Sequence, residues 1–162
     1  MVKEYPKRKP NRLQNYDYSQ NNAYFITICT KDRINLFGEI CDGNMCLNDC
    51  GKIAENEILK IPSHYNTVRI DKFVVMPNHV HMIIVINPSE RINPFPTETD
   101  IPNVIGKYKA GVTRTVGNAF MRSAIWQRSY HDHIIRGEAD YQKIWQYIDT
   151  NPMKWNLDKY HV

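Results

Sequence analysis

The sequence has no long apolar run. Its longest candidate, Met82–Ile86, has the length of a strand, whereas a helix that crosses a membrane needs about 18 consecutive apolar residues. The opening residues MVKEYPKRKP contain no apolar segment of the kind found in secretory signals. Internal repeats and low-complexity tracts are also absent. We therefore expect a cytoplasmic protein without a membrane anchor.

Cysteine is scarce, with four residues at positions 29, 41, 46 and 50. Because no secretory signal is seen, we expect a reducing compartment and free thiols. The last three cysteines form a C-x4-C-x3-C arrangement, whereas zinc sites generally use C-x2-C pairs. The spacing therefore favours buried or hairpin cysteines over a zinc knuckle.

Neither sign of charge is in large excess. The chain has 21 Lys and Arg against 17 Asp and Glu, and a net charge of +4 permits a polyanionic partner without requiring one. With 42% hydrophobic and 23% charged residues, the composition is typical of a soluble globular protein. Its 162 residues suffice for one compact domain but hardly for two, so we expect a single core.

Residues 1–22 differ in composition from the rest of the chain. They contain prolines, amides and basic residues without apolar periodicity, which predicts an N-terminal arm ahead of one domain over residues 23–162. The arm can be a solvated tail or can contact phosphates. Its candidate phosphate-contacting residues are Lys7, Arg8, Lys9 and Arg12.

The apolar patterns of the domain predict interleaved strands and helices. The predicted strands span residues 24–30, 37–40, 45–47, 68–75, 80–86 and 126–135, with a hairpin turn at Asp42-Gly43-Asn44. The predicted helices span about residues 48–60, 103–120 and 138–150, and a proline-rich surface loop is expected over 88–102. This order indicates an α+β, ferredoxin-like fold, in which helices pack on an antiparallel or mixed sheet.

Two histidines stand out on the strand that ends at Ile86. His79 and His81 are two residues apart, so both imidazoles project from one face, and Val80 points into apolar packing on the other. Two buried imidazoles are costly to desolvate unless something engages their nitrogens, and a divalent ion is one such partner. The pair is either a metal pincer or a structural pair.

A second pair, His131 and His133, has the same spacing. If its strand is a neighbour of the first pair's strand, His133 can reach the same site; otherwise the pair lies on a partly exposed face. A histidine-triad hydrolase would need a third histidine where Ile83 stands, so that class is disfavoured.

The last predicted helix carries Tyr147 and Asn151 on one face, because residues four apart lie one turn apart. Lys143 extends that row by a further turn. A nucleophile and a ligand can share such a row, although a tyrosine in this position can equally be a residue at the edge of the core.

Several blocks occur in a recognisable order. They are FITICT (25–30), Arg33, Phe37-Gly38, VMPNHVH (75–81), WQRS (126–129), DHIIR (132–136) and YIDTNP (147–152). Over about residues 23–155, the chain thereby resembles the single-tyrosine HUH transposases, in particular the REP-associated, IS200-like tyrosine transposases. His131 departs from the family, which more often has an aromatic residue in that region.

The resemblance implies a ferredoxin-like domain that acts on single-stranded DNA, usually with a hairpin. It places the family's histidine pair on His79 and His81, its nucleophile on Tyr147 and its third, amide-bearing metal ligand on Asn151. The implied reaction is metal-dependent DNA nicking and strand transfer through a 5′-phosphotyrosine link. The implied ion is Mg²⁺ or Mn²⁺, although imidazole ligands on their own suit Mn²⁺ or Zn²⁺ better than Mg²⁺.

Basic residues outside the arm give further candidates for DNA contact. They are Lys107, Lys109, Arg114 and Arg136. Gly137, just before the tyrosine helix, lets that helix pack on its own body or on a partner's, so a monomer and a helix-swapped homodimer are both open.

Two rival functions stay open at the level of sequence. One is a ferredoxin-like module that binds nucleic acid without cutting it. The other is a metal hydrolase of small phosphoesters that uses both histidine pairs and forms no covalent intermediate.

Overall fold

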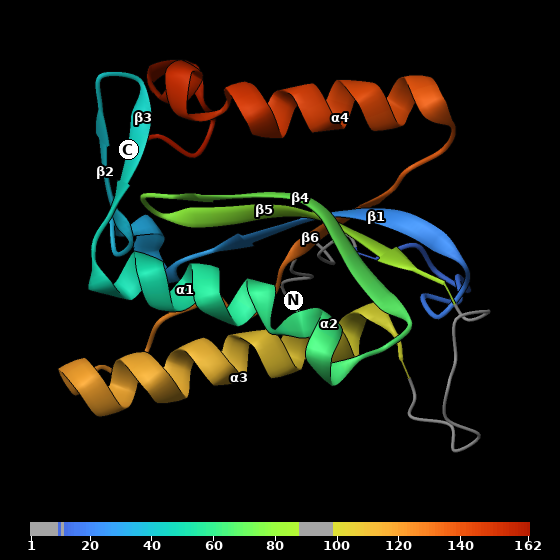
Figure 1. The fold of residues 1–162 in the computed structure, drawn as a ribbon, viewed down its shortest axis with the longest axis horizontal. Helices are drawn as coiled ribbons and strands as arrows, with labels where there is room; N and C mark the ends of the chain where they lie inside the picture. Colours follow the sequence, from blue (N-terminus) through green and yellow to red (C-terminus); the bar gives the residue numbers. More distant parts are fainter. Residues whose placement is uncertain (1–9, 11, 88–98) are drawn as a thin grey trace, which may run out of the picture.

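The computed structural model of the chain describes residues 10, 12–87 and 99–162 (Figure 1). Its strands are β1 (Asn22–Cys29), β2 (Gly38–Cys41), β3 (Asn44–Leu47), β4 (Val68–Met76), β5 (His79–Ile86) and β6 (His131–Ile134). Its α-helices are α1 (Asp49–Leu59), α2 (Ile61–His64), α3 (Ile101–Phe120) and α4 (Glu138–Thr150), and its 3₁₀ segments include η1 (Lys31–Arg33) and η3 (Pro152–Leu157).

A four-stranded sheet of order β4-β5-β1-β6 forms the centre of the molecule, and every neighbouring pair in it is antiparallel. The succession β1-α1-β4-β5-α3-β6 is the βαββαβ pattern of a ferredoxin-like fold, so the predicted α+β class is confirmed. The hairpin β2–β3 is inserted after β1, and α4 is appended after β6.

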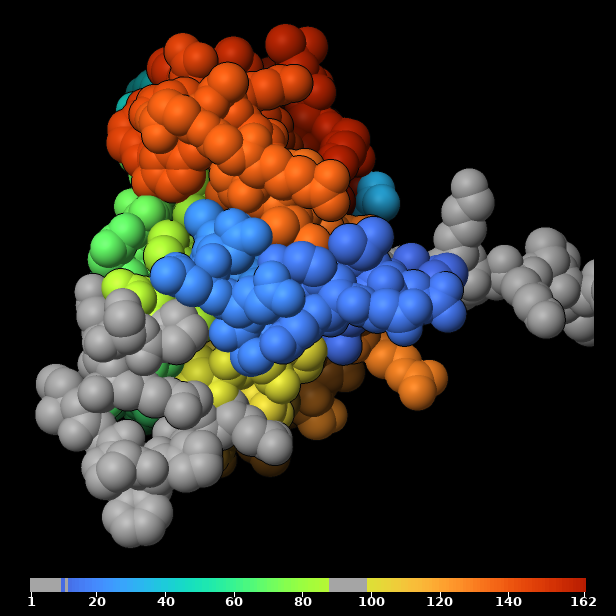
Figure 2. Space-filling model, turned by 90° about the vertical axis from the view of Figure 1, so that its right-hand side faces the viewer, coloured from blue at the N-terminus to red at the C-terminus, as the bar shows by residue number. Residues whose placement is uncertain are grey.

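The two faces of the sheet are covered by different helices. Helices α1 and α3 pack on one face over the main core, whereas α4 lies across the other face (Figure 1). Figure 2 shows the same layers end-on, with the orange and red C-terminal elements above and the yellow start of α3 below. A smaller apolar cluster beneath α4 contains Ile83, Ile135, Ile144 and Ile148.

Residue alternation on β5 explains this division. Val80, Met82 and Ile84 point into the main core, and the residues between them point toward α4. Both sides of β5 are therefore buried, which is why the strand reads as an almost continuous apolar run apart from its two histidines.

The predicted hairpin at residues 37–47 is confirmed. Strands β2 and β3 pair with Cys41 opposite Asn44, so Asp42 and Gly43 form a two-residue turn. Both have positive φ, 50° and 74°, which is the conformation that an Asp-Gly turn favours between twisted strands.

Two predicted boundaries were wrong, and one short helix was not predicted. Helix α3 begins at Ile101 rather than near 103, because Asp100 accepts a hydrogen bond from the Asn103 N–H and Pro102 is tolerated in the first turn. The predicted end of the first helix near Lys60 is confirmed, since α1 ends at Leu59, but a separate short helix, α2, which was not predicted, follows with Pro62 in its first turn. Strand β6 covers only 131–134 of the predicted 126–135, and Trp126 makes a single bridge to Thr30.

Part of the expected arm lies outside the described residues, including Lys7, Arg8 and Lys9, as do residues 88–98 of the expected loop. Closer to β1, Tyr18 is buried in the main core and packs against Tyr16 and Tyr24. Over the described residues, no helix is long and apolar enough to cross a membrane.

Candidate active site

The centre of the site is the α4-facing side of β5 and β1. His79 and His81 point to this side and are 0% and 1% exposed. Thr27 lies opposite His81 in the register of β1 with β5. The two histidines therefore project from one face of β5, as their spacing of two residues predicts.

The two imidazole rings face each other through their Nε2 atoms. The Nε2 atoms of His79 and His81 are 3.0 Å apart. Each Nδ1 atom has its own partner at 2.8 Å, which is Asn78 Oδ1 for His79 and Thr27 Oγ1 for His81. A hydrogen bond at Nδ1 fixes the ring orientation, which is how metal-binding histidines are usually held.

The hydrogen bonds of Asn78 fix the tautomer of His79. The Asn78 Nδ2 group donates to the carbonyl oxygens of Tyr160, at 2.8 Å, and Arg33, at 3.2 Å. Its Oδ1 must therefore face His79, where it accepts a hydrogen bond from the Nδ1–H. This leaves the Nε2 lone pair of His79 pointing into the site.

Burial keeps both histidines neutral. Desolvation lowers the pKa of His79 to about 4 and holds the pKa of His81 well below its usual value. A neutral imidazole is the form that binds a metal ion, so neither ring has to lose a proton near neutral pH.

Two oxygen-bearing side chains complete the pocket. Asn151 is 2% exposed and its Nδ2 group donates to Asp158 Oδ2 at 2.8 Å. Among the described residues, nothing hydrogen-bonds the Asn151 Oδ1 atom. Asp158, with a side chain only 1% exposed, has its Oδ2 atom 4.0 Å from His79 Nε2.

This donor set fits a divalent cation. One ligand atom each from His79, His81 and Asp158 lies within 4.8 Å of the others, and Asn151 adds a buried oxygen that lacks a partner among the described residues. Imidazole nitrogens on their own suit Mg²⁺ poorly, whereas a set that mixes imidazole and oxygen donors suits Mn²⁺. Asn151, Asp158 and the two histidines are therefore the residues that could hold the ion.

Tyr147 lies beside this donor set. Its hydroxyl is 3.4 Å from His81 Nε2, and its ring makes edge contacts with His81 and Phe25. The residue is 37% exposed and lines a cavity of about 590 Å³ together with His81 and Lys143. Burial, with the negative charge of Asp158, raises the pKa of Tyr147 to about 12, so the phenol keeps its proton near neutral pH.

The second histidine pair does not join the first. Strand β1 lies between β5 and β6, so the two pairs are not on neighbouring strands. His133 is exposed and its Nε2 atom lies 2.8 Å from Asp140 Oδ2, although it lines the same cavity as Tyr147. Among the described residues, the group of potential metal ligands contains neither His131 nor His133.

The predicted DNA-contacting residues fall in two places. Lys107, Lys109 and Arg114 lie on α3, beneath the sheet face opposite to α4 (Figure 1). Lys109 donates from Nζ to the carbonyl oxygens of Gln127 and Arg128, and so ties that segment to α3.

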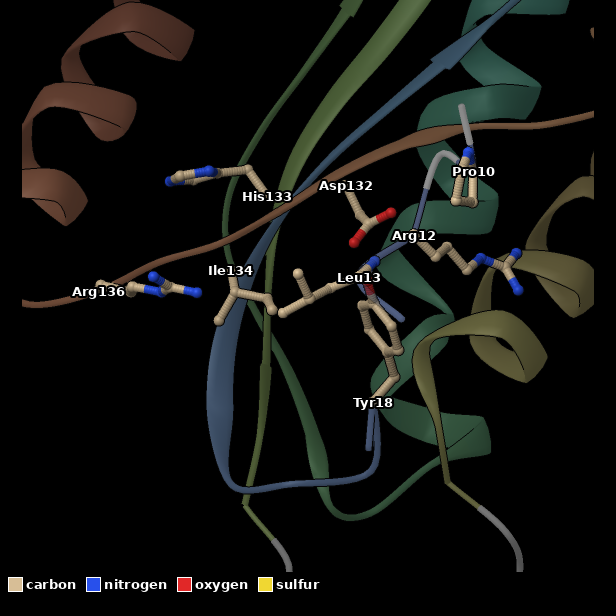
Figure 3. Close-up of a pocket in the computed structure, with 8 residues that line it drawn as sticks. All are labelled: Pro10, Arg12, Leu13, Tyr18, Asp132, His133, Ile134 and Arg136. Carbon is tan, nitrogen blue, oxygen red and sulfur yellow. Dashed lines mark hydrogen bonds between the residues drawn. The ribbon is translucent and has the colours of Figure 1, made fainter. Parts of the chain in front are cut away.

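Arg12 and Arg136 instead line a cavity of about 420 Å³ beside β6 (Figure 3). The guanidinium of Arg12 lies 4.7 Å from the ring centroid of Tyr130. In Figure 3, Asp132 and His133 project to opposite sides of β6, with Asp132 on the side of Leu13 and Tyr18.

Sequence reasoning missed Asp158, Thr27 and Asn78. Asp158 follows the helical segments in a stretch without a pattern, so only the folded chain places it near His79. Thr27 and Asn78 lie inside the motifs FITICT and VMPNHVH. Their hydrogen bonds to the histidine rings explain why a hydroxyl and an amide stand at these positions.

Comparison with known proteins identifies the family. The sequence model of the transposases described as "Transposase IS200 like" matches residues 17–151, which is most of the chain. The chain belongs to the IS200-like transposase family.

Three individual proteins resemble this transposase family member. A Haemophilus influenzae protein named only as uncharacterized is 38% identical over 96% of this chain and 93% of its own length. A second protein from the same organism, named "Putative REP-associated tyrosine transposase", is 25% identical over 88% of this chain and 77% of its own length. A solved REP-associated tyrosine transposase bound to a REP hairpin has a TM-score of 0.65 at 21% identity, covering 91% of this chain and 76% of that one.

Proposed function

We propose that this transposase nicks single-stranded DNA and transfers the cut strand through a covalent bond to Tyr147. The observation that carries the proposal is that the Tyr147 hydroxyl lies 3.4 Å from His81 Nε2, which itself faces His79 Nε2 at 3.0 Å. A nucleophile and a candidate cation-binding pair from distant parts of the sequence are thus in contact.

His79, His81 and Asn151 would hold a divalent cation, Mg²⁺ or Mn²⁺, with Asp158 beside them. When bound, such an ion makes a phosphodiester more electrophilic and stabilises negative charge on the leaving oxygen. The side chains contribute their part beforehand. Thr27 and Asn78 hold the two rings in place, and Asp158 holds the amide of Asn151.

Tyr147 supplies the oxygen that attacks the scissile phosphorus. Its O–P bond forms as the bond from phosphorus to the 3′ oxygen breaks, so the 5′ end stays on the protein and the 3′ end leaves. The phenolic proton is lost from Tyr147 and one proton is gained by the 3′ oxygen, which becomes a hydroxyl. Because one phosphoester replaces another, rejoining needs no nucleotide energy source.

The proposed substrate is single-stranded DNA with a hairpin, by analogy with the structural relative that is bound to a REP hairpin. One copy of the chain contains every residue of the proposed centre, since Tyr147 contacts the His81 of its own chain. A monomer is therefore sufficient, and a helix-swapped homodimer would rebuild the same centre with exchanged α4 helices.

The experiment is a search for a protein–DNA adduct. Labelled single-stranded hairpins with randomised flanks are incubated with the protein and Mn²⁺, and the products are separated under denaturing conditions. We expect a labelled band at the mass of protein plus DNA, which is lost in Tyr147→Phe and when the ion is chelated. DNA binding by Tyr147→Phe should be retained.

One control variant and two alternative outcomes separate the rival functions. Tyr141→Phe alters a tyrosine of the same helix that bonds Asp71, away from the histidines, and should leave the adduct intact. Uncut DNA with intact binding would instead support a non-catalytic nucleic-acid-binding module. Phosphoester turnover that survives Tyr147→Phe without an adduct would support a metal hydrolase.

A further inference from the structure

A groove leads away from the proposed centre across β1 toward β6. The cavity that contains Tyr147 and His81 shares five lining residues with a neighbouring cavity of about 440 Å³. The shared residues are Phe25, Thr27, His133, Lys159 and Tyr160. Since the same side chains line both, the two cavities adjoin, and we call them together the β6 groove.

Three basic residues line this groove. Lys143 on α4 and Lys159 after η3 line the part next to Tyr147, and Arg33 of η1 lines the far part. All three residues are exposed, and they come from three separate segments of the chain. The Arg33 guanidinium also donates to the Lys159 carbonyl oxygen at 3.4 Å, which places these two residues side by side.

Two of the three carboxylates that line the groove have hydrogen-bond partners. Asp140 accepts from the Arg136 backbone N–H and pairs with His133. Asp158 accepts from Asn151 and from the Tyr160 backbone N–H. The third carboxylate, Asp132, projects to the other side of β6 from His133 (Figure 3). The three carboxylates are partly buried, whereas Arg33, Lys143 and Lys159 are exposed, so the cations are the charges more accessible to a ligand.

The floor of the groove is aromatic. Phe25 stacks at a tilt on His81, with ring centroids 5.2 Å apart, and its partner across the strands is His133. Tyr160 lies 5.7 Å from the His81 ring. Aromatic rings below a row of cations are the combination that binds unpaired nucleotides, because bases stack on the rings and phosphates meet the charges.

We propose that the β6 groove binds the single-stranded DNA that flanks the scissile phosphate, with Arg33, Lys143 and Lys159 contacting its phosphates. This proposal rests on the proposed function, because the groove opens directly from Tyr147. It differs from an assignment to α3, whose Lys107 and Arg114 lie under the opposite face of the sheet.

The test measures binding of a fluorescent oligothymidylate to the full chain in EDTA, so that no cleavage occurs. Dissociation constants are taken at several salt concentrations between about 50 and 200 mM. Each lost phosphate contact on a single strand should reduce the slope of log K against log salt by about 0.7. The groove variants are Arg33→Gln, Lys143→Gln and Lys159→Gln, and their matched controls on α3 are Arg114→Gln and Lys107→Gln.

We expect each groove variant to make the slope shallower by about 0.7 and both α3 variants to leave the slope unchanged. Equal slopes in all variants, or a loss confined to the α3 variants, would overturn the proposal. Lys143→Gln replaces an exposed helical side chain, so it keeps the test valid if Arg33→Gln does not fold. If the groove pattern appears but the wild-type protein forms no adduct with Mn²⁺, the proposed function fails while the groove stands.

Discussion

Asn151 and Asp158 are joined by a hydrogen bond of 2.8 Å from the amide Nδ2 to the carboxylate Oδ2. This bond determines which end of the amide faces the histidines, because an amide whose nitrogen is engaged must present its oxygen to the other side. The Asn151 Oδ1 atom is accordingly buried, and no described residue hydrogen-bonds it. Asp158 thus positions a candidate ligand in addition to lying close to His79 itself.

Removing Asp158 should weaken metal binding. We expect Asp158→Ala to reduce Mn²⁺ affinity about 10- to 100-fold, because the amide of Asn151 loses its orienting partner. Asp158→Asn keeps one side-chain oxygen and should fall between the wild type and Asp158→Ala. The measurement is a titration of free Mn²⁺ by electron paramagnetic resonance. The control is Asp149→Ala, which removes a half-exposed carboxylate bonded to Lys72. Equal affinity in Asp158→Ala and the control would contradict this role.

Thr27→Val and Thr67→Val form a matched pair of substitutions. Both threonines are 3% exposed, but Thr27 bonds His81 Nδ1 whereas the hydroxyl of Thr67 has no partner among the described residues. Thr27→Val should lower the free energy of unfolding by about 1–3 kcal/mol, since it leaves a buried ring nitrogen unsatisfied. Thr67→Val should be neutral or stabilising. Urea denaturation measures both, and equal losses would show that the bond to His81 contributes nothing.

The apolar contact that holds α4 on the sheet can be tested at Ile148. This side chain is 0% exposed in the small cluster with Ile83 and Ile144, and it immediately follows Tyr147. Ile148→Ala should lower the free energy of unfolding by about 2–5 kcal/mol. Gln146→Ala, on the exposed side of the same helix, should change it by less than about 0.5 kcal/mol. Similar values for the two variants in urea denaturation would mean that α4 does not pack as described.

Two helical glycines should respond in opposite directions to alanine. A Cβ atom at Gly51 would lie 2.1 Å from the Phe37 carbonyl oxygen, so Gly51→Ala forces α1 away from the chain beside it. At Gly106 on α3, no atom of the described residues lies within 4 Å of the added carbon. Gly106→Ala should therefore raise the free energy of unfolding by about 0.5–1 kcal/mol, and Gly51→Ala should lower it. A stabilised Gly51→Ala variant would contradict the packing of α1.

Local sequence patterns predicted most of the fold. Helix α4 begins and ends at the predicted residues because Gly137 precedes it and Asn151-Pro152 follows it. The β2–β3 turn followed from its Asp-Gly step. The boundaries that failed were those set by tertiary contacts, such as β6, which ends where pairing with β1 ends.

The site was predictable only where its residues share one element. His79 and His81 follow from alternation on a strand, and Tyr147 and Asn151 follow from helical spacing. Strand order and the path of the chain bring these two pairs together and place Asp158, which follows η3, near His79. No local sequence pattern encodes either of them. The family resemblance supplied that missing relation for Tyr147 but gave no indication of Asp158.

The most direct test of the account is to identify the residue that becomes bonded to DNA. After incubation with Mn²⁺ and the hairpin pool, the adduct is digested with protease and nuclease, and the peptide that carries a nucleotide is sequenced by mass spectrometry. The account predicts a nucleotide on the phenol of Tyr147. A nucleotide on Tyr160, whose ring lies 4.6 Å from that of His79, or on any other residue would contradict it.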